Sequence, residues 1–148
     1  MGENQKLRLF AGDSLYSCET LNEGQQAVKG LILAVPWHQE LPAAQPFVDK
    51  VKKQWKEEEV DWRTATSYDA TKAFIYALSK SGDDPTKAKV LEKLKKVNLL
   101  PKETSGKNLR FNSKREIIGE ALLVKVVESE NSSCFNSNLD FSLVKEEE

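Results

Sequence analysis

The first part of the chain places short apolar segments between turn residues. Residues 7–10 alternate apolar and polar side chains and run into Ala11-Gly12-Asp13-Ser14, which predicts a short strand ending in a turn. Residues 29–35 hold a continuous apolar run before Pro36. Such runs are typical of strands buried on both faces of a mostly parallel sheet. Pro36 lacks an N–H and should end the ladder of hydrogen bonds there.

The middle of the chain has helical spacing. One apolar stripe recurs every four residues and predicts a first helix: Phe47, Val51 and Trp55. The segment Thr66-Ser67-Tyr68-Asp69 resembles a capping box, which predicts that a second helix begins there and runs to about Lys80. Asp84-Pro85 predicts the start of a third helix, because Pro is favoured at the first helical position.

Two further strands are predicted at 109–111 and 121–127. Residues 129–148 are rich in Ser and Asn and end in Lys-Glu-Glu-Glu, so we expect a poorly packed polar tail. The order of strands, three helices and strands predicts a layered α/β or α+β fold, and the pattern alone does not separate the two.

Composition and charge exclude several function classes. The 148 residues suit one domain. The 22 basic and 23 acidic residues nearly cancel, which argues against a nucleic-acid binder. The longest mainly apolar run, 31–35, is far shorter than the roughly 20 residues of a membrane span. The first residues lack the charged start and apolar stretch of a signal peptide, so we expect none in this chain.

The chain has two cysteines and one histidine, without C-x-x-C or H-E-x-x-H spacing, so we expect no metal site and no cofactor. Two alternatives remain for Cys18 and Cys134: a disulfide in an oxidising compartment, or two free thiols, which we favour. The tripeptide beginning at Asn131 fits a glycosylation acceptor, a pattern that is common by chance.

Three segments together resemble a known family. They are residues 9–17 (LFAGDSLYS), 30–38 (GLILAVPWH) and 62–73 (WRTATSYDATKA). In this order and spacing they resemble the type I periplasmic binding proteins, and within them the branched-chain amino-acid receptors of ABC transporters. Residues 106–111 (GKNLRF), followed by 121–127, are similar to the closing strands of that family. The resemblance covers roughly residues 7–128.

The resemblance implies part of a bilobal α/β fold, with mostly parallel strands and flanking helices. It matches only the later half of such a receptor. Residues 1–35 and 107–128 would belong to the second lobe and residues 36–106 to the first, with 129–148 as a tail. A hinge crossing would run through Pro36, Trp37 and His38. The chain departs from the family after Phe111, where 112–116 replaces the usual Gly-Asp turn.

The resemblance also suggests ligand-binding residues. Asp13 would hold the α-ammonium group of a ligand by a charge-assisted hydrogen bond, with Tyr16 facing the same cleft. Trp62, Arg63 and Tyr68 lie at the start of a helix. The helix N-terminus and Arg63 would bind an anionic group of the ligand, while Trp62 and Tyr68 would cover its aliphatic part. The alternative for Asp13 is a turn aspartate bonded to its own backbone. For Tyr16 the alternative is the edge of the core. For Trp62, Arg63 and Tyr68 it is a buried cluster at the helix start, with Arg63 in a surface ion pair.

These residues favour a receptor over an enzyme. His38 has no nucleophile motif beside it, and we favour a hinge or rim role for it. The chain is interpreted as a C-terminal part of a substrate-binding component, or ligand-sensing domain, for amino-acid-like solutes, working with membrane transporter subunits. The alternative is a truncated half that oligomerises with copies of itself without binding ligand. The parent family is periplasmic or extracellular.

Overall fold

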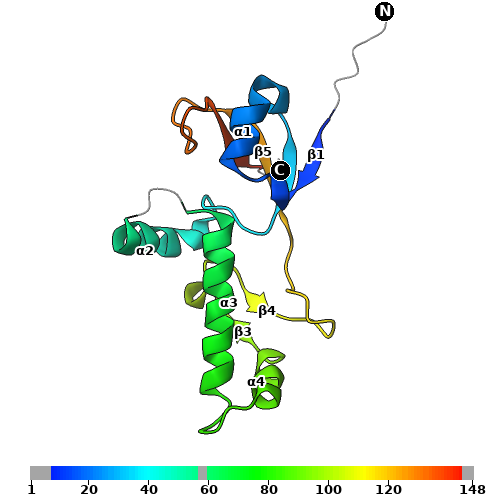
Figure 1. Ribbon diagram of the computed structural model, residues 1–148, viewed down its shortest axis with the longest axis vertical. Helices are drawn as coiled ribbons and strands as arrows, with labels where there is room; N and C mark the ends of the chain where they lie inside the picture. Colours follow the sequence, from blue (N-terminus) through cyan, green and yellow to red (C-terminus); the bar gives the residue numbers. More distant parts are fainter. Residues whose placement is uncertain (1–7, 57–59, 145–148) are drawn as a thin grey trace, which may run out of the picture. The chain divides into compact units, whose positions relative to one another are not determined.

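The computed structural model describes residues 8–56 and 60–144 and divides the chain into two compact units (Figure 1). Unit 1 comprises residues 1–36 and 121–148, and unit 2 comprises residues 37–120. Residues 107–120 therefore cluster with 37–106, whereas the sequence analysis grouped 107–128 together. The reason is the pairing of residues 98–99 with 109–110, which ties the segment to unit 2.

The elements, with η for 3-10 helices, follow in chain order: β1 (Phe10–Gly12), η1 (Asp13–Leu15), α1 (Cys18–Gly24), η2 (Gln25–Val28), β2 (Ile32–Val35), η3 (Pro42–Ala44), α2 (Gln45–Trp55), α3 (Trp62–Ser79), α4 (Lys87–Leu94), β3 (Asn98–Leu99), η4 (Pro101–Glu103), β4 (Leu109–Arg110), β5 (Leu122–Glu128) and β6 (Leu139–Leu143). In the part of the chain described, none of the helices combines the length and apolar character needed to cross a bilayer.

Unit 1 is built on a four-stranded sheet in the order β1-β2-β5-β6. β1 and β2 are parallel, while β2 with β5 and β5 with β6 are antiparallel. The α/β class is confirmed, but the sheet is mixed where mostly parallel strands were expected, because β5 returns directly alongside β2. In that pairing Val35 lies opposite Leu122, so the two chain segments that lead to unit 2 leave from neighbouring strand ends.

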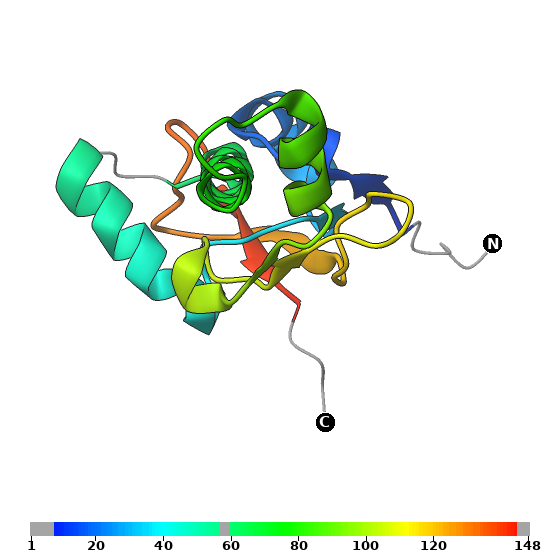
Figure 2. The ribbon, with the colours of Figure 1, turned by 90° about the horizontal axis from the view of Figure 1, so that it is seen from below.

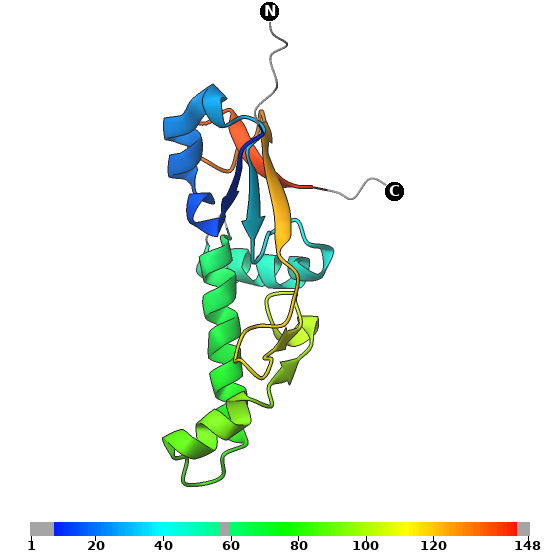
Figure 3. The ribbon, with the colours of Figure 1, turned by 90° about the vertical axis from the view of Figure 1, so that its right-hand side faces the viewer.

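One face of this sheet carries the core of unit 1. Leu33, Val35, Val124 and Val126 are buried there and cluster with Leu21 of α1, which covers this side (Figure 3). The next residues along each strand point the other way, because successive strand side chains alternate. The other face is partly solvent-exposed. Its exposed members are Phe10, Ala34, Leu123 and Lys125. β2 is thus not fully buried on both faces, as its sequence had suggested.

The expectation of a poorly packed tail is wrong for residues 139–143, which form β6 at the sheet edge. Leu139 is completely buried and Phe141 nearly so, and the alternation of apolar and polar residues in LDFSL explains why. Cys134, just before this strand, is bonded to Cys18 at the start of α1. Their Cα atoms are 5.3 Å apart, and the preference for free thiols is therefore corrected.

Unit 2 packs its helices around small apolar clusters. In α2, Phe47, Val48 and Val51 are buried, while Trp55, the last member of the predicted stripe, is 55% exposed. α3 and α4 lie side by side, and Figure 2 looks along α3 with α4 next to it. α4 begins after Thr86, whose hydroxyl accepts the Lys89 N–H, rather than at Asp84-Pro85.

The α3 helix begins four residues before the predicted capping box. Asp61 caps it, since its carboxylate accepts the N–H of Thr64 at 2.7 Å. Thr66 lies inside the helix, and its hydroxyl donates to the carbonyl of Trp62 at 2.9 Å. Both Asp61 and Thr66 are good caps by residue type, and the earlier one starts the helix.

The loop that leads into β4 packs closely on η3. Gly106 has a φ of +112°, and a Cβ built on it would lie 2.5 Å from the Cα of Ala44. The neighbouring Ser105 carbonyl accepts the indole N–H of Trp37 at 2.9 Å. This loop is therefore held by close backbone packing and by a buried hydrogen bond, and the close packing leaves no room for a side chain at Gly106.

Candidate functional site

Asp13 is the residue on unit 1 that best fits a ligand-binding role. It directly follows β1 at the carboxyl end of the parallel β1–β2 pair, the end at which ligands sit in doubly wound sheets. Its backbone carbonyl accepts the N–H of Tyr16 at 3.0 Å, so the turn is closed by the main chain. The half-buried carboxylate has no hydrogen-bond or ion-pair partner within residues 8–56 and 60–144, unlike an ordinary turn aspartate.

Tyr16 packs in the core of unit 1. Its ring meets the ring of Phe141 edge-on, with centroids 4.7 Å apart. It is half-buried and lies against the same apolar cluster as α1. This position matches the alternative reading of Tyr16 as a core-edge residue, and a ligand contact for its ring remains a prediction.

The start of α3 in unit 2 holds the other predicted ligand residues. The guanidinium carbon of Arg63 lies 4.7 Å from the centre of the Trp62 ring, a cation–π contact. Nη1 of Arg63 also lies 3.6 Å from Oδ2 of Asp61, in a pair whose side chains are 55% and 40% exposed. The indole N–H of Trp62 is buried and has no acceptor among the residues that the structure describes.

Two features change the expectation for this helix start. The Asp61 carboxylate already occupies the N-terminus of α3, where an anionic ligand would otherwise bind. Tyr68 lies further along the helix, with its ring 4.9 Å from the ring of Phe47 in the core of unit 2. Arg63 and the Trp62 ring are therefore better placed than the helix N-terminus to contact a ligand.

The predicted hinge residues lie at a boundary between units. Unit 1 ends its first segment at Pro36, and unit 2 begins at Trp37. Trp37 and His38 are each 2% exposed. Nδ1 of His38 lies 3.1 Å from the backbone nitrogen of Glu40, whose N–H it accepts, and 3.9 Å from Oε2 of the same residue.

A buried contact that sequence reasoning missed joins α3 to the loop before β4. The carboxylate of Asp69 accepts two hydrogen bonds from Ser105, one from its N–H and one from its hydroxyl, each 2.7 Å long. Ser105 is completely buried. Because Trp37 donates to the carbonyl of Ser105, the three residues form one network within unit 2. The capping-box reading had assigned Asp69 a local role that it does not have.

Burial is the largest influence on the titration of Asp69. It raises the pKa of this carboxyl above its ordinary value, while the hydrogen bonds from Ser105 and the charge of Lys107 act in the opposite direction. Burial likewise lowers the pKa of Lys107, opposed by Asp69 and Glu120. The burial of both groups outweighs their mutual attraction.

We expect Asp69→Ala to lower the free energy of unfolding by about 1–3 kcal/mol, because it leaves two buried donors of Ser105 without an acceptor. Asp69→Asn keeps an acceptor and should cost less.

A carboxyl with a raised native pKa binds its proton more tightly when folded, so its contribution to stability is present at low pH and is lost as pH rises through that pKa. Urea unfolding between about pH 3 and pH 7 tests this, and an unchanged pH profile in Asp69→Asn would contradict it.

Comparison with known proteins settles the family. The family model described as "Periplasmic binding protein" matches residues 2–131, which is most of the chain. The chain belongs to the periplasmic binding protein family. Members of this family are solute-binding receptors and not enzymes, and they work in the periplasm or outside the cell. Comparison with curated proteins gives no significant match.

Solved periplasmic binding proteins share the fold. A leucine binding protein, LivK, from Thermotoga maritima is 21% identical with a TM-score of 0.73, over 95% of this chain. An ABC transporter substrate-binding protein from Sphaerobacter thermophilus is 19% identical, with a TM-score of 0.72 over 95%. One from Desulfitobacterium hafniense, in complex with Leu, is 19% identical with a TM-score of 0.63 over 94%. The chain spans only 38%, 37% and 36% of these three proteins.

These findings confirm the resemblance to the branched-chain amino-acid receptors and the partial periplasmic-binding-protein fold. The longer structures contain additional chain beyond the part that aligns with residues of this protein. The ligand-binding roles of individual residues rest on the geometry described above.

Proposed function

We propose that this periplasmic binding protein chain binds an amino-acid-like solute as part of the substrate-binding receptor of an ABC transporter. The observation that carries the proposal is the Asp13 carboxylate, half-buried at the carboxyl end of β1 and without a partner among the described residues. A carboxylate in this position is suited to accept charge-assisted hydrogen bonds from an α-ammonium group.

The printed descriptions of the relatives support the class of ligand. One is a leucine binding protein and another is described in complex with Leu. An aliphatic amino acid also fits the residues of unit 2, since the Trp62 ring offers an apolar surface and Arg63 a guanidinium that can meet a carboxylate. A ligand carboxylate that binds Arg63 competes with the Asp61 carboxylate, because Oδ2 of Asp61 lies 3.6 Å from Nη1 of Arg63.

The disulfide supports an exported receptor. Cys18 and Cys134 are joined across unit 1, and disulfides persist in oxidising compartments such as the periplasm. We propose that the natural protein works there with membrane transporter subunits. Pro36, Trp37 and His38, at the passage from unit 1 to unit 2, are proposed as hinge residues in that receptor.

Thermal unfolding of the purified chain with L-leucine, L-isoleucine and L-valine tests the proposal. A ligand at 100 times its dissociation constant should add about 2.7 kcal/mol of stability and raise Tm by several degrees. We expect this rise in the unmodified chain and its loss in Asp13→Asn. The matched control, Glu130→Gln, removes an exposed carboxylate of the same unit and should respond like the unmodified chain. A full response in Asp13→Asn would contradict the ammonium role.

A second candidate function is self-association without ligand. Unit 1 exposes Phe10 (66%) and Leu123 (47%) on its sheet, and α3 of unit 2 exposes Phe74 and Ile75. Uncovered apolar faces of this kind recruit partners. Light scattering on the same samples separates the two candidates, because a dimer that shows no response to any amino acid favours self-association, and a monomer excludes it.

A further inference from the structure

The α3 helix of unit 2 is apolar on two opposite sides. One side is buried in the unit and consists of small residues: Ala65, Ala73 and Ala77. On the other side three large apolar side chains are about half exposed: Phe74 (54%), Ile75 (55%) and Leu78 (47%). A helix on the surface of a protein normally presents polar and charged residues on the side that faces water. The exposed side of α3 therefore has the character of a contact surface.

This exposed side is also uncharged along about three turns of the helix. Within the described helix, none of the exposed positions from Ser67 to Ser79 holds a charged residue, although charged residues make up 30% of the chain. A partner can therefore cover this side without taking an ionised group out of water. The hydroxyl of Thr71 donates to the carbonyl of Ser67 at 2.9 Å, and it keeps this bond when the side is covered.

Residue size changes along the exposed side of α3. Its first half holds small residues and its second half large ones: Ser67, Ala70 and Thr71, then Phe74, Ile75 and Leu78. In an antiparallel pair of two α3 helices, the first half of each helix faces the second half of the other. With the two-fold axis between positions 72 and 73, helical spacing brings Ser67 opposite Leu78 of the second copy. Ala70 then meets Phe74, and Thr71 meets Ile75.

We propose that two copies of this chain associate through α3, as an antiparallel helix pair about a two-fold axis. The order of sizes is self-complementary, because one surface supplies both the large side chains and the small residues that leave room for them. A parallel pair would set large residues against large ones and small against small, which packs poorly. A contact of about three turns is small for a protein interface, so we expect a weak dimer with Kd on the order of 10 μM to 1 mM.

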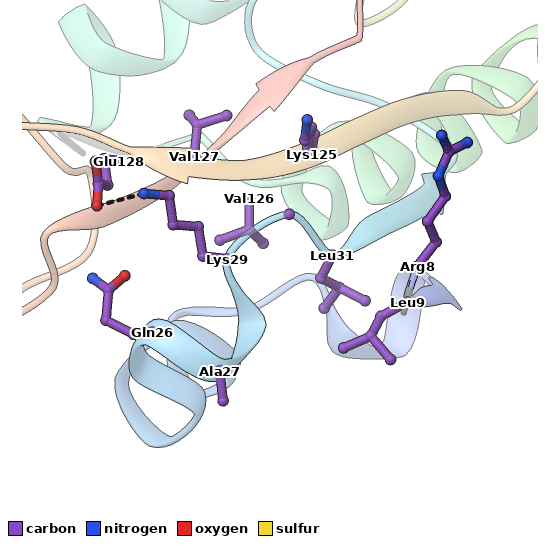
Figure 4. A pocket seen from close by; sticks show the side chains of 11 residues that line it. Arg8, Leu9, Gln26, Ala27, Lys29, Leu31, Lys125, Val126, Val127 and Glu128 are labelled. Carbon is purple, nitrogen blue, oxygen red and sulfur yellow. Dashed lines mark ion pairs between the residues drawn. The ribbon is translucent and has the colours of Figure 1, made fainter. Parts of the chain in front are cut away.

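The exposed face of the unit 1 sheet is less suited to a second copy. The strand register sets Phe10, Ile32 and Lys125 side by side across β1, β2 and β5. Lys125 is exposed on this face, whereas the next residue, Val126, is 1% exposed and belongs to the core on the other face (Figure 4). A partner on this face would enclose the Lys125 ammonium, which is costly unless that charge is paired. The exposed side of α3 has no such charge at its centre.

The inference gives the self-association considered above a specific interface, and it does not rest on ligand binding. The dimer uses residues of unit 2, whereas Asp13 belongs to unit 1. Asp13→Asn should therefore dimerise like the unmodified chain. A dimer that gives no thermal response to amino acids would contradict the receptor function and leave this interface standing. A dimer that persists when α3 is altered would overturn this interface and leave self-association standing.

Sedimentation velocity of the purified chain from about 10 μM to about 1 mM tests the proposal. We expect a reversible dimer that increases with concentration. Ser67→Glu and Leu78→Lys should each weaken dimerisation by about tenfold or more, because each places an unpaired charge in the contact. The controls make the same replacements outside α3: Ser113→Glu and Leu100→Lys, where Leu100 is also 47% exposed. Both controls should dimerise like the unmodified chain.

The double variant Ser67→Glu, Leu78→Lys tests the antiparallel register, and we expect its dimer to recover to within about threefold of the unmodified chain. Within one helix the two positions are about 16 Å apart, too far to form an ion pair, whereas in the antiparallel dimer each new carboxylate faces a new ammonium. In a parallel pair like charges would meet, and the double variant would dimerise no better than either single variant. That result, a strictly monomeric chain at 1 mM, or single variants that dimerise normally would each overturn the proposal.

Discussion

Gly106→Ala should lower the free energy of unfolding by about 2–5 kcal/mol, a large fraction of the roughly 5–15 kcal/mol that keeps a typical domain folded. Two costs add at this position. The φ of +112° is strained for any residue with a Cβ, at about 1–2 kcal/mol, and the new methyl would lie 2.5–2.7 Å from the backbone of Ala43 and Ala44. Backbone atoms cannot move aside like the end of a side chain, so η3 or the loop itself must shift.

Substitutions at two other glycines allow the cost of the strained φ and the cost of the backbone clash to be measured separately. Gly82 has a φ of +79° and open space where a Cβ would lie, so Gly82→Ala should show the conformational cost alone. Gly119 has open space and a φ outside the left-handed region, so Gly119→Ala should be close to neutral. Urea unfolding followed by tryptophan fluorescence measures all three, since Trp37 lies in the affected unit. A loss in Gly106→Ala no larger than in Gly82→Ala would show that the loop has room to move.

Replacing both cysteines should lower the stability of unit 1 by about 2–5 kcal/mol, which corresponds to a fall in Tm of roughly 8–20 °C or more. The bond joins residues 116 positions apart in the sequence and ties the loop before β6 to the start of α1. Without it, the unfolded chain gains conformational freedom, and β6 is held only by its pairing with β5 and by the burial of Leu139 and Phe141.

The measurement is a melting curve of Cys18→Ala, Cys134→Ala beside the unmodified chain, each with and without reducing agent. Reductant should lower the Tm of the unmodified chain to that of the double variant and leave the variant unchanged. Limited proteolysis should then cut after Glu128 or Glu130 more readily in the variant. Equal melting of both chains under oxidising conditions would show that the bond contributes little.

Much of the fold could be predicted from local patterns. The apolar run before Pro36 identified β2, and the mainly apolar segment 121–127 identified β5, because burial against α1 requires those side chains. The start of α3 was placed too late, since Asp61 and Thr66 are both suitable caps and the sequence does not say which one is used. β6 was missed because only five residues with period two lie within a segment rich in Ser and Asn.

The candidate site was predictable to a smaller extent. A turn after a short strand placed Asp13 at the carboxyl end of β1, but nothing in the sequence shows that its carboxylate lacks a partner. The bond from Ser105 to Asp69 spans 36 residues, and no periodicity links positions so far apart.

The chain enters and leaves unit 2 from one place in unit 1. Val35 and Leu122 are paired neighbours on β2 and β5, so unit 2 is an insertion at the tip of what would otherwise be a simple hairpin. Tension applied to the two ends of the chain acts first on β1 and β6, the edge strands. As long as β2 and β5 stay paired, almost none of that force passes through the insertion. The Cys18–Cys134 bond closes a covalent loop around unit 2, so its two connections carry load only when this bond is reduced and the sheet has separated.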